Sequence, residues 1–190
     1  PLSSAPSPAR LAALSLLPPT RTALASLLAL APPAPERLAA NAAALTKELP
    51  IRLARRVRDL RALPFYVATV PHIGRVLERY ERATAAILDA GEMGTVEESR
   101  RLAGILVGLL DETEHVTENL ALGLREANRR AEAMRLELDL QPFLRGMTAS
   151  RIGRRVLAEH HIALHAQLAA TEAPLPPGGA AAAAAAAAVA

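Results

Sequence analysis

The chain has 190 residues, of which 43 are alanine and 32 are leucine, and it contains no cysteine and no tryptophan. The lack of cysteine excludes a disulfide framework, a thiolate zinc site and a cysteine nucleophile. Alanine, leucine, arginine and glutamate favour helices, whereas the β-branched and aromatic residues that favour sheets are scarce. The composition therefore predicts an all-α protein with a single domain.

Charge is almost balanced along most of the chain, although 21 of the 22 basic residues are arginine. The formal net charge is +3, and residues 36–173 hold 20 basic and 19 acidic residues. Proteins that bind nucleic acid usually concentrate basic residues on one segment or face. We therefore expect no specific nucleic-acid partner.

Residues 1–35 contain two arginines and no acidic residue, and they are rich in serine, proline, alanine and leucine. This composition indicates either the flank of an organellar transit peptide or an extended, low-complexity arm. Arg21 and the Pro18–Pro19 pair interrupt the apolar residues, so no run reaches the roughly 20 residues that a transmembrane helix needs.

Amphipathic helices are predicted from residue 36 onward. Residues 36–48 are rich in alanine and leucine, and a new helix is expected at Pro50 because proline is tolerated in a first helical turn. One face of segment 51–61 is apolar, and most of the other face is arginine. Such a face is usually a solvated surface, and the alternative is a contact with phosphate or with an acidic partner. These candidate contact residues are Arg52, Arg55, Arg56, Arg58 and Arg61.

A further helix is expected after Pro71, before the turn at Gly91–Gly94. From Leu102 to Leu138, apolar and small residues recur at alternating three- and four-residue steps, which is the seam of a bundle helix. An unbroken helix from Val96 to Leu138 would be roughly 60 Å long at a rise of about 1.5 Å per residue.

Pro142 marks a break, and a last helix is predicted from Phe143 to about Ala170. Long antiparallel helices with short connections in region 36–170 predict a four-helix bundle. Residues 171–190 include nine consecutive alanines and are predicted to be a low-complexity tail.

The last predicted helix contains a histidine cluster. His161 and His165 are four residues apart and could chelate a metal, but no third ligand is evident, so no metal site is expected. His161 also lies in line with apolar residues, which predicts an interior histidine hydrogen-bonded to a neighbouring helix. His72 and His115 are isolated and are expected at helix caps or on the surface. Because no phosphate-binding loop, dinucleotide fingerprint or serine elbow is present, we expect no cofactor.

Four segments together resemble the N-terminal helical domain of the mitochondrial 2-oxo acid dehydrogenase kinases, above all the branched-chain type. They are ELPIRLARRVRDLRALPF at 48–65, LLD at 109–111, LALGLRE at 120–126 and FLRGMTASRIGRRVLAEHHIALH at 143–165. The last segment is the most specific, and its motif positions include Arg151, Arg155, His160 and His161. The resemblance covers about residues 45–170. Thr113 and His115 depart from the His-x-Asp order of the family at that position.

The resemblance implies a four-helix bundle that helps to dock the kinase on the lipoyl-bearing E2 core of its dehydrogenase complex. His161 falls where the family carries a characteristic histidine. In the family, ATP binding and phosphotransfer belong to a second, C-terminal domain, and no motif of that domain occurs in this sequence. A catalytic role for any residue of this chain is therefore not expected.

Two functional hypotheses follow. Because the sequence stops before any ATP-binding motif, the first is a non-catalytic scaffold subunit of a larger mitochondrial assembly, such as a respiratory complex, ATP synthase or the mitoribosome. The alternative is the E2-docking regulatory domain of an active mitochondrial serine kinase whose ATPase domain lies outside this chain. Both place the chain in the mitochondrial matrix, with neighbouring subunits or the lipoyl domain of E2 as partners.

Overall fold

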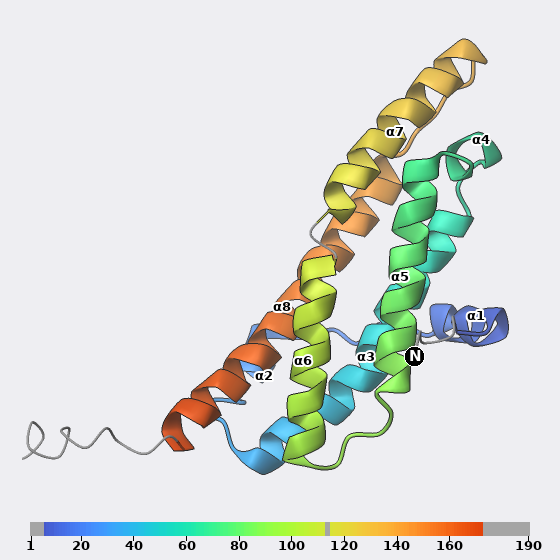
Figure 1. Ribbon diagram of the computed structural model, residues 1–190. Helices are drawn as coiled ribbons and strands as arrows, with labels where there is room; N and C mark the ends of the chain where they lie inside the picture. Colours follow the sequence, from blue (N-terminus) through green and yellow to red (C-terminus); the bar gives the residue numbers. More distant parts are fainter. Residues whose placement is uncertain (1–5, 113–114, 173–190) are drawn as a thin grey trace, which may run out of the picture.

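A computed structural model describes residues 6–112 and 115–172, and within them it contains helices and no strands (Figure 1). The prediction of an all-α fold is confirmed. No helix in this described part is long and apolar enough to cross a membrane. The helices are α1 Pro8–Leu16, α2 Leu24–Leu28, α3 Pro35–Arg61, α4 Phe65–Ala68, α5 Pro71–Asp89, α6 Val96–Glu112, α7 Val116–Ala133 and α8 Gln141–Glu172.

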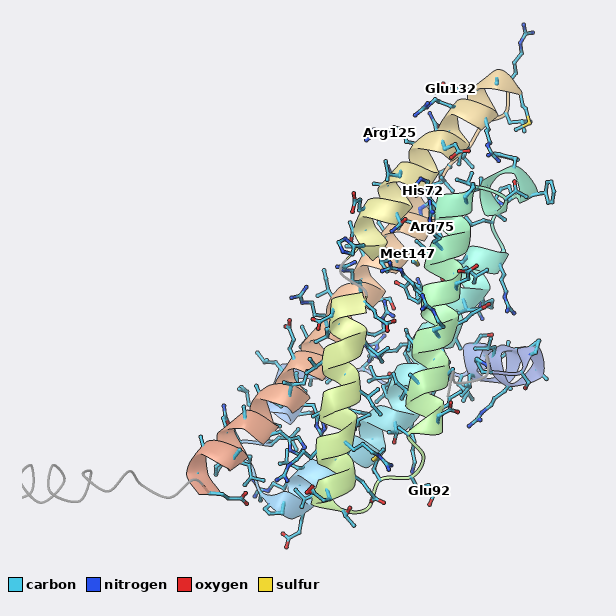
Figure 2. All side chains as sticks on the ribbon, in the orientation of Figure 1. His72, Arg75, Glu92, Arg125, Glu132 and Met147 are labelled. Atoms are coloured by element: carbon cyan, nitrogen blue, oxygen red, sulfur yellow. The ribbon has the colours of Figure 1, made fainter. Side chains whose placement is uncertain are left out.

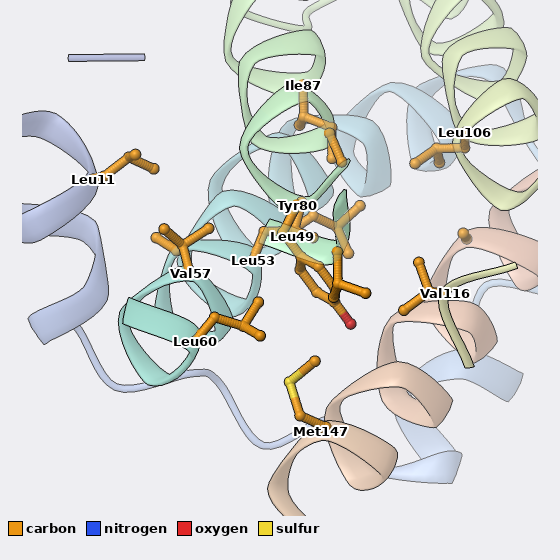
Figure 3. Close-up of a cluster of buried hydrophobic side chains, with 14 of the residues drawn as sticks. Leu11, Leu49, Leu53, Val57, Leu60, Tyr80, Ile87, Leu106, Val116 and Met147 are labelled. Atoms are coloured by element: carbon orange, nitrogen blue, oxygen red, sulfur yellow. The ribbon is translucent and has the colours of Figure 1, made fainter. Parts of the chain in front are cut away.

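The long helices pack lengthwise around one core, with α3 in contact with α1, α5, α6 and α8. Helix α5 also packs against α7, and α6 packs against α8. The core is built from leucine, valine, isoleucine and alanine side chains of these helices, together with Tyr80 and Met147 (Figure 3). A second, smaller cluster of Leu38, Leu164 and Leu168 joins α3 to the C-terminal part of α8.

Helix α3 runs through Pro50, so the prediction of a new helix at that residue is wrong. Proline inside a helix removes one hydrogen bond and crowds the preceding turn. However, the buried stripe Leu45, Leu49, Leu53 and Val57 continues past Pro50 in four-residue steps, and Pro50 is itself buried. Packing of one uninterrupted apolar face therefore outweighs the local penalty.

The single helix considered from Val96 to Leu138 is not formed, because α6 ends at Glu112 and α7 begins at Val116. His115 occupies the position before α7 and its side chain is exposed, in agreement with the expected cap or surface role. The seam itself is largely buried on both sides of the break, at Leu102, Leu106, Val116, Leu120, Gly123, Ala127 and Ala131. Thr113 and the tail from residue 173 lie outside the described residues.

Helix α8 begins at Gln141 and confirms the last predicted helix, with Pro142 in its first turn. Figure 2 shows His72 and Arg75 at the start of α5, beside α7. His72 is half-buried there, and its Nδ1 accepts a hydrogen bond from Arg75 Nη2 at 3.0 Å.

The N-terminal segment contains α1 and α2, and so differs from the extended arm that its composition suggested. Helix α1 begins at Pro8, and Ser7 Oγ accepts a hydrogen bond from the Arg10 N–H. Leu11 of α1 is buried in the main core against α3. The Ser7 cap and the burial of Leu11 thus favour helix formation in a segment whose composition alone indicates low complexity.

The turn after α7 places a non-glycine residue in a left-handed conformation, since Arg135 has φ 54°. The Leu136 N–H donates to the Ala131 carbonyl at 2.9 Å, which is the helix-ending geometry that usually requires glycine.

We expect Arg135→Gly to raise the free energy of unfolding by about 1 kcal/mol, because glycine adopts this conformation without steric strain. Urea denaturation followed by circular dichroism measures the change. Arg135→Ala is the matched control, since it removes the same side chain and keeps the strain; an equal gain in both variants would contradict the explanation.

Candidate functional site

A pocket with a volume of about 60 Å³ opens between α3, α5, α6, α7 and α8. Its walls are mostly apolar, and its polar groups gather on the side of α8. The apolar residues are Leu49, Leu53, Ala83, Ile87, Leu106, Leu109, Leu110, Val116 and Ala158. The polar residues are Tyr80, Arg151, Arg154 and Arg155.

Arg154 and Tyr80 are in direct contact at the wall of the pocket. The guanidinium carbon of Arg154 lies 4.6 Å from the centre of the Tyr80 ring, and Nη2 donates to the Tyr80 hydroxyl at 2.8 Å. Arg154 Nε also donates to the Ser150 carbonyl at 3.2 Å. Tyr80 is buried among core leucines with its hydroxyl towards α8 (Figure 3). This cation–π pair fixes Arg154 at the edge of an apolar chamber.

Arg151 lines the same pocket with an unsatisfied donor, because its Nη1 atom is buried and has no hydrogen-bond partner. A buried guanidinium N–H without an acceptor is unfavourable, and an acceptor placed in the pocket would relieve this. Arg155 differs, since its Nε donates to Glu159 at 2.7 Å. The pocket is lined by three arginines, and Glu159 supplies one negative charge beside Arg155, so the pocket has an excess of positive charge.

The sequence singled out Arg151 and Arg155 as motif positions, and the structure brings both to the pocket. Arg154 and Tyr80 were not singled out. The signal for Arg154 is its spacing, because residues 151, 154 and 155 lie on one face of a helix. The role of Tyr80 could not be read from the sequence, because its partner Arg154 is 74 positions away on another helix.

His161 is fully buried and hydrogen-bonded to neighbouring helices, so the prediction of a satisfied interior histidine is confirmed. The Asn41 side-chain amide donates to His161 Nδ1 at 2.9 Å, and His161 Nε2 donates to the Ser99 carbonyl at 3.3 Å. The Ser99 hydroxyl donates to the Leu38 carbonyl at 3.0 Å, so it accepts from His165 Nε2 at 2.7 Å. This network ties α3, α6 and α8 together and is consistent with two neutral histidines.

The pKa of His161 is lowered to about 4, chiefly by burial and to a smaller extent by His165 and His160, whereas the hydrogen bond to the Ser99 carbonyl opposes the shift. Burial also lowers the pKa of His165, assisted by Arg100 and opposed by Glu97. His160 does not join this network, and its Nδ1 atom is buried without a hydrogen-bond partner. No three histidine, aspartate or glutamate side chains gather as a metal site within residues 6–112 and 115–172.

The five candidate contact arginines of α3 form contacts within the chain. Arg52, Arg55 and Arg58 donate to backbone carbonyls of the N-terminal segment. Arg56 pairs with Asp59 at 2.8 Å, and Arg61 pairs with Glu81 at 2.6 Å. Burial lowers the pKa of Arg56, while Asp59 opposes that shift. Contact of these arginines with an acidic partner stays a prediction.

A family model described as mitochondrial branched-chain alpha-ketoacid dehydrogenase kinase matches residues 21–179. The chain belongs to this kinase family. It corresponds to the N-terminal domain of the mitochondrial 2-oxo acid dehydrogenase kinases, as its motifs predicted. A mitochondrial pyruvate dehydrogenase (acetyl-transferring) kinase from Arabidopsis thaliana is 29% identical over 139 residues. That match covers 70% of this chain and 36% of the plant protein, so the chain spans little more than a third of that relative.

In this kinase-family domain, one sequence motif contributes to both the pocket and the histidine network. Segment 143–165 carries the pocket arginines in its middle and His161 towards its end. The pocket and the histidine network therefore lie on the same helix, α8, and both reach across to α3 and α6.

The low pKa of His161 makes stability depend on pH. Between pH 7 and pH 5 the unfolded chain takes up a proton near the ordinary pKa of 6.5, whereas the folded chain does not. We therefore expect the free energy of unfolding to fall by about 2 kcal/mol from pH 7 to pH 5, with a smaller contribution in the same direction from His165. Urea denaturation at pH 5, 6 and 7 checks this.

The variant His161→Gln keeps a polar side chain of similar reach and should flatten that pH dependence. His115→Gln is the control, because it removes an exposed histidine and should leave the dependence intact. Equal slopes in the wild type and His161→Gln would show that other groups cause the loss of stability.

Proposed function

We propose that this chain is the regulatory and E2-docking domain of a mitochondrial 2-oxo acid dehydrogenase kinase, and that its pocket binds a small apolar carboxylate. The observation that carries the proposal is the buried, unpartnered Nη1 of Arg151 beside an apolar chamber. A carboxylate supplies the missing acceptor together with a negative charge, and planar guanidinium groups bind carboxylates in bidentate fashion.

The size of the pocket restricts the ligand to a carboxylate with a short apolar tail. A volume of about 60 Å³ leaves room for a few carbon atoms against Leu53, Ile87 and Leu106. The three arginines at the α8 wall orient the charged end, with Arg154 held in place by Tyr80. Branched-chain 2-oxo acids have this chemistry, and they are the substrates of the dehydrogenase named in the family description. Binding at this site would make the kinase sensitive to the concentration of the dehydrogenase substrate.

An apolar surface between α2 and α8 favours the docking function. Leu24 and Leu28 of α2 are 71% and 65% exposed, and Ile152 of α8 is 59% exposed. Leu27 and Val156 line a hollow between these two helices. A hollow lined by apolar side chains, with exposed apolar residues on the two helices that border it, is typical of an interaction site. We propose that the lipoyl domain of E2 docks on this surface, since its lipoyl arm is an extended apolar group.

The whole kinase, in this proposal, phosphorylates serine on its dehydrogenase through a second domain, and it works in the mitochondrial matrix. The mitochondrial family description and the mitochondrial plant relative support this placement. The scaffold hypothesis, with a role in a respiratory complex, ATP synthase or the mitoribosome, receives no support from the family match. We therefore favour the regulatory domain.

The pocket is tested by titrating the chain with 4-methyl-2-oxopentanoate in a calorimeter. We expect Arg151→Gln to weaken binding at least about 10-fold, because a hydrogen-bonded charge pair contributes about 1.5–3 kcal/mol. Arg145→Gln is the matched control, since Arg145 is an exposed arginine on the same helix. Acetate, which lacks the apolar tail, should bind more weakly than the branched acid. Equal affinities of wild type and Arg151→Gln would contradict the assignment.

Docking is tested by surface plasmon resonance on immobilised E2 lipoyl domain with and without the lipoyl group. We expect the double variant Leu24→Ser and Leu28→Ser to lose at least about 10-fold in affinity, because each buried leucine side chain contributes about 1.5–3 kcal/mol. Leu16→Ser is the control, since Leu16 is equally exposed on α1. Binding that is independent of the lipoyl group, or an equal loss in the control, would overturn this docking surface.

A further inference from the structure

Residues 15–22 cross α3 as a segment held by the side chains of one helical stripe. The stripe consists of four residues spaced four, three and three positions apart, so that all point from the same face. We call this set the clamp: Glu48, Arg52, Arg55 and Arg58.

The clamp binds the backbone of the segment at four points. Arg58 Nη1 donates to the Ser15 carbonyl at 2.9 Å, and Arg55 Nη1 donates to the Leu17 carbonyl at 3.2 Å. Arg52 Nη2 donates to the Thr20 carbonyl at 2.7 Å. The Glu48 carboxylate accepts from the Thr20 N–H at 3.0 and 3.1 Å, and it also accepts from Arg52 Nε at 2.6 Å.

After α1 ends at Leu16, the segment leaves the helix in an extended conformation. Leu17 has φ −71° and ψ 139°, which is polyproline II geometry, and Pro18 and Pro19 follow it. Chains in this conformation leave their carbonyls free of internal hydrogen bonds. Because the clamp contacts main-chain atoms, except for a long contact of 3.5 Å from Arg52 to Thr22 Oγ1, it tolerates different side chains.

Beyond the clamp, burial holds this segment only at Ser15, which is buried in the last turn of α1. All residues from 16 to 26 are exposed, including Leu16 and Leu17, so their ordering is not driven by burial of apolar surface. Ordering eight residues costs conformational entropy. The stretch between α1 and the half-buried Leu27 is held mainly by its polar contacts with the clamp, and these contacts must offset the entropy cost. A competing segment that binds the clamp can therefore displace this stretch.

The charges of the clamp favour an acidic segment over residues 15–22. Within the clamp, Arg52 pairs with Glu48 at 2.6 Å and Arg58 lies 3.8 Å from Asp59, whereas Arg55 meets only a neutral carbonyl of the segment. Residues 1–35 contain no acidic side chain, so the segment adds no negative charge and the clamp keeps an excess of positive charge. Arginine pairs more strongly with carboxylates than with carbonyls. We propose that the clamp is a docking surface for an acidic, proline-containing extended segment of a partner protein, and that residues 15–22 mask it in the free chain. This surface is distinct from the carboxylate pocket, and it adjoins the hollow between α2 and α8, which is lined in part by Arg52 and residues 19–22. The proposal does not depend on carboxylate binding in the pocket.

The test uses the variant Thr20→Pro, which removes the N–H held by Glu48, keeps the polyproline geometry and leaves every clamp arginine in place. Thr20→Ser is the matched control because it keeps the N–H. The probe is a fluorescein-labelled peptide of five Glu-Pro repeats, with five Gln-Pro repeats as the uncharged counterpart. Fluorescence anisotropy measures binding, and trypsin cleavage after Arg21 measures release of the segment.

We expect Thr20→Pro to bind the Glu-Pro peptide at least about 10-fold more tightly than the wild type or Thr20→Ser, with faster cleavage after Arg21. Adding Arg55→Gln and Arg58→Gln to Thr20→Pro should remove that gain, and the Gln-Pro peptide should bind weakly to every variant. Circular dichroism of all variants checks that the bundle remains folded.

Several results would overturn the proposal. An unchanged cleavage rate at Arg21 would show that the clamp does not hold the segment. Equal affinity for the two peptides, or a gain that survives loss of Arg55 and Arg58, would show that the charge of the clamp is not what binds. Binding of Thr20→Pro to phosphatidylglycerol vesicles without binding to the peptide would assign the surface to a membrane instead.

Discussion

The apolar stripe of α3 is the constraint on which the rest of the molecule depends. It continues from Leu38 to Leu60 through Pro50, and α1, α5, α6 and α8 all pack against this one helix. A break at Pro50 would rotate the two halves relative to each other and separate the main core from the cluster around Leu38. The penalty of one internal proline is small compared with the free energy gained from the apolar surface that a continuous α3 buries.

Two glycines of α8 face arginine side chains of α3. A Cβ atom at Gly146 would lie 2.7 Å from Arg56 Nη1, and one at Gly153 would lie 3.0 Å from Arg52 Nη1. The guanidinium groups of α3 therefore lie against bare backbone of α8. Glycine at these positions leaves room for the guanidinium groups of Arg52 and Arg56 against α8, close to the pocket arginines that flank Gly153.

Sequence periodicity predicted which residues face the core, and it could not predict where helices break. The seam from Leu102 keeps its phase across the gap between α6 and α7, so the same pattern fits one helix or two. His161 could be identified as interior because it lies in line with Leu157 and Leu164 on α8. Its partners Asn41 and Ser99 could not, since contacts between helices 60 or more residues apart leave no local pattern. The family motif indicated Arg151 and Arg155 without indicating what they do.

The preference for arginine over lysine has a structural reason in this chain. Arg52 acts in three directions at once: Nε pairs with Glu48, Nη2 donates to Thr20, and Nη1 lies against Gly153. Arg154 likewise stacks on Tyr80 and donates to two acceptors. A lysine ammonium has no planar face to stack and no fork of donors at fixed angles. Helices joined through several contacts of one side chain therefore require guanidinium groups, and the excess of arginine reflects packing between helices as well as charge.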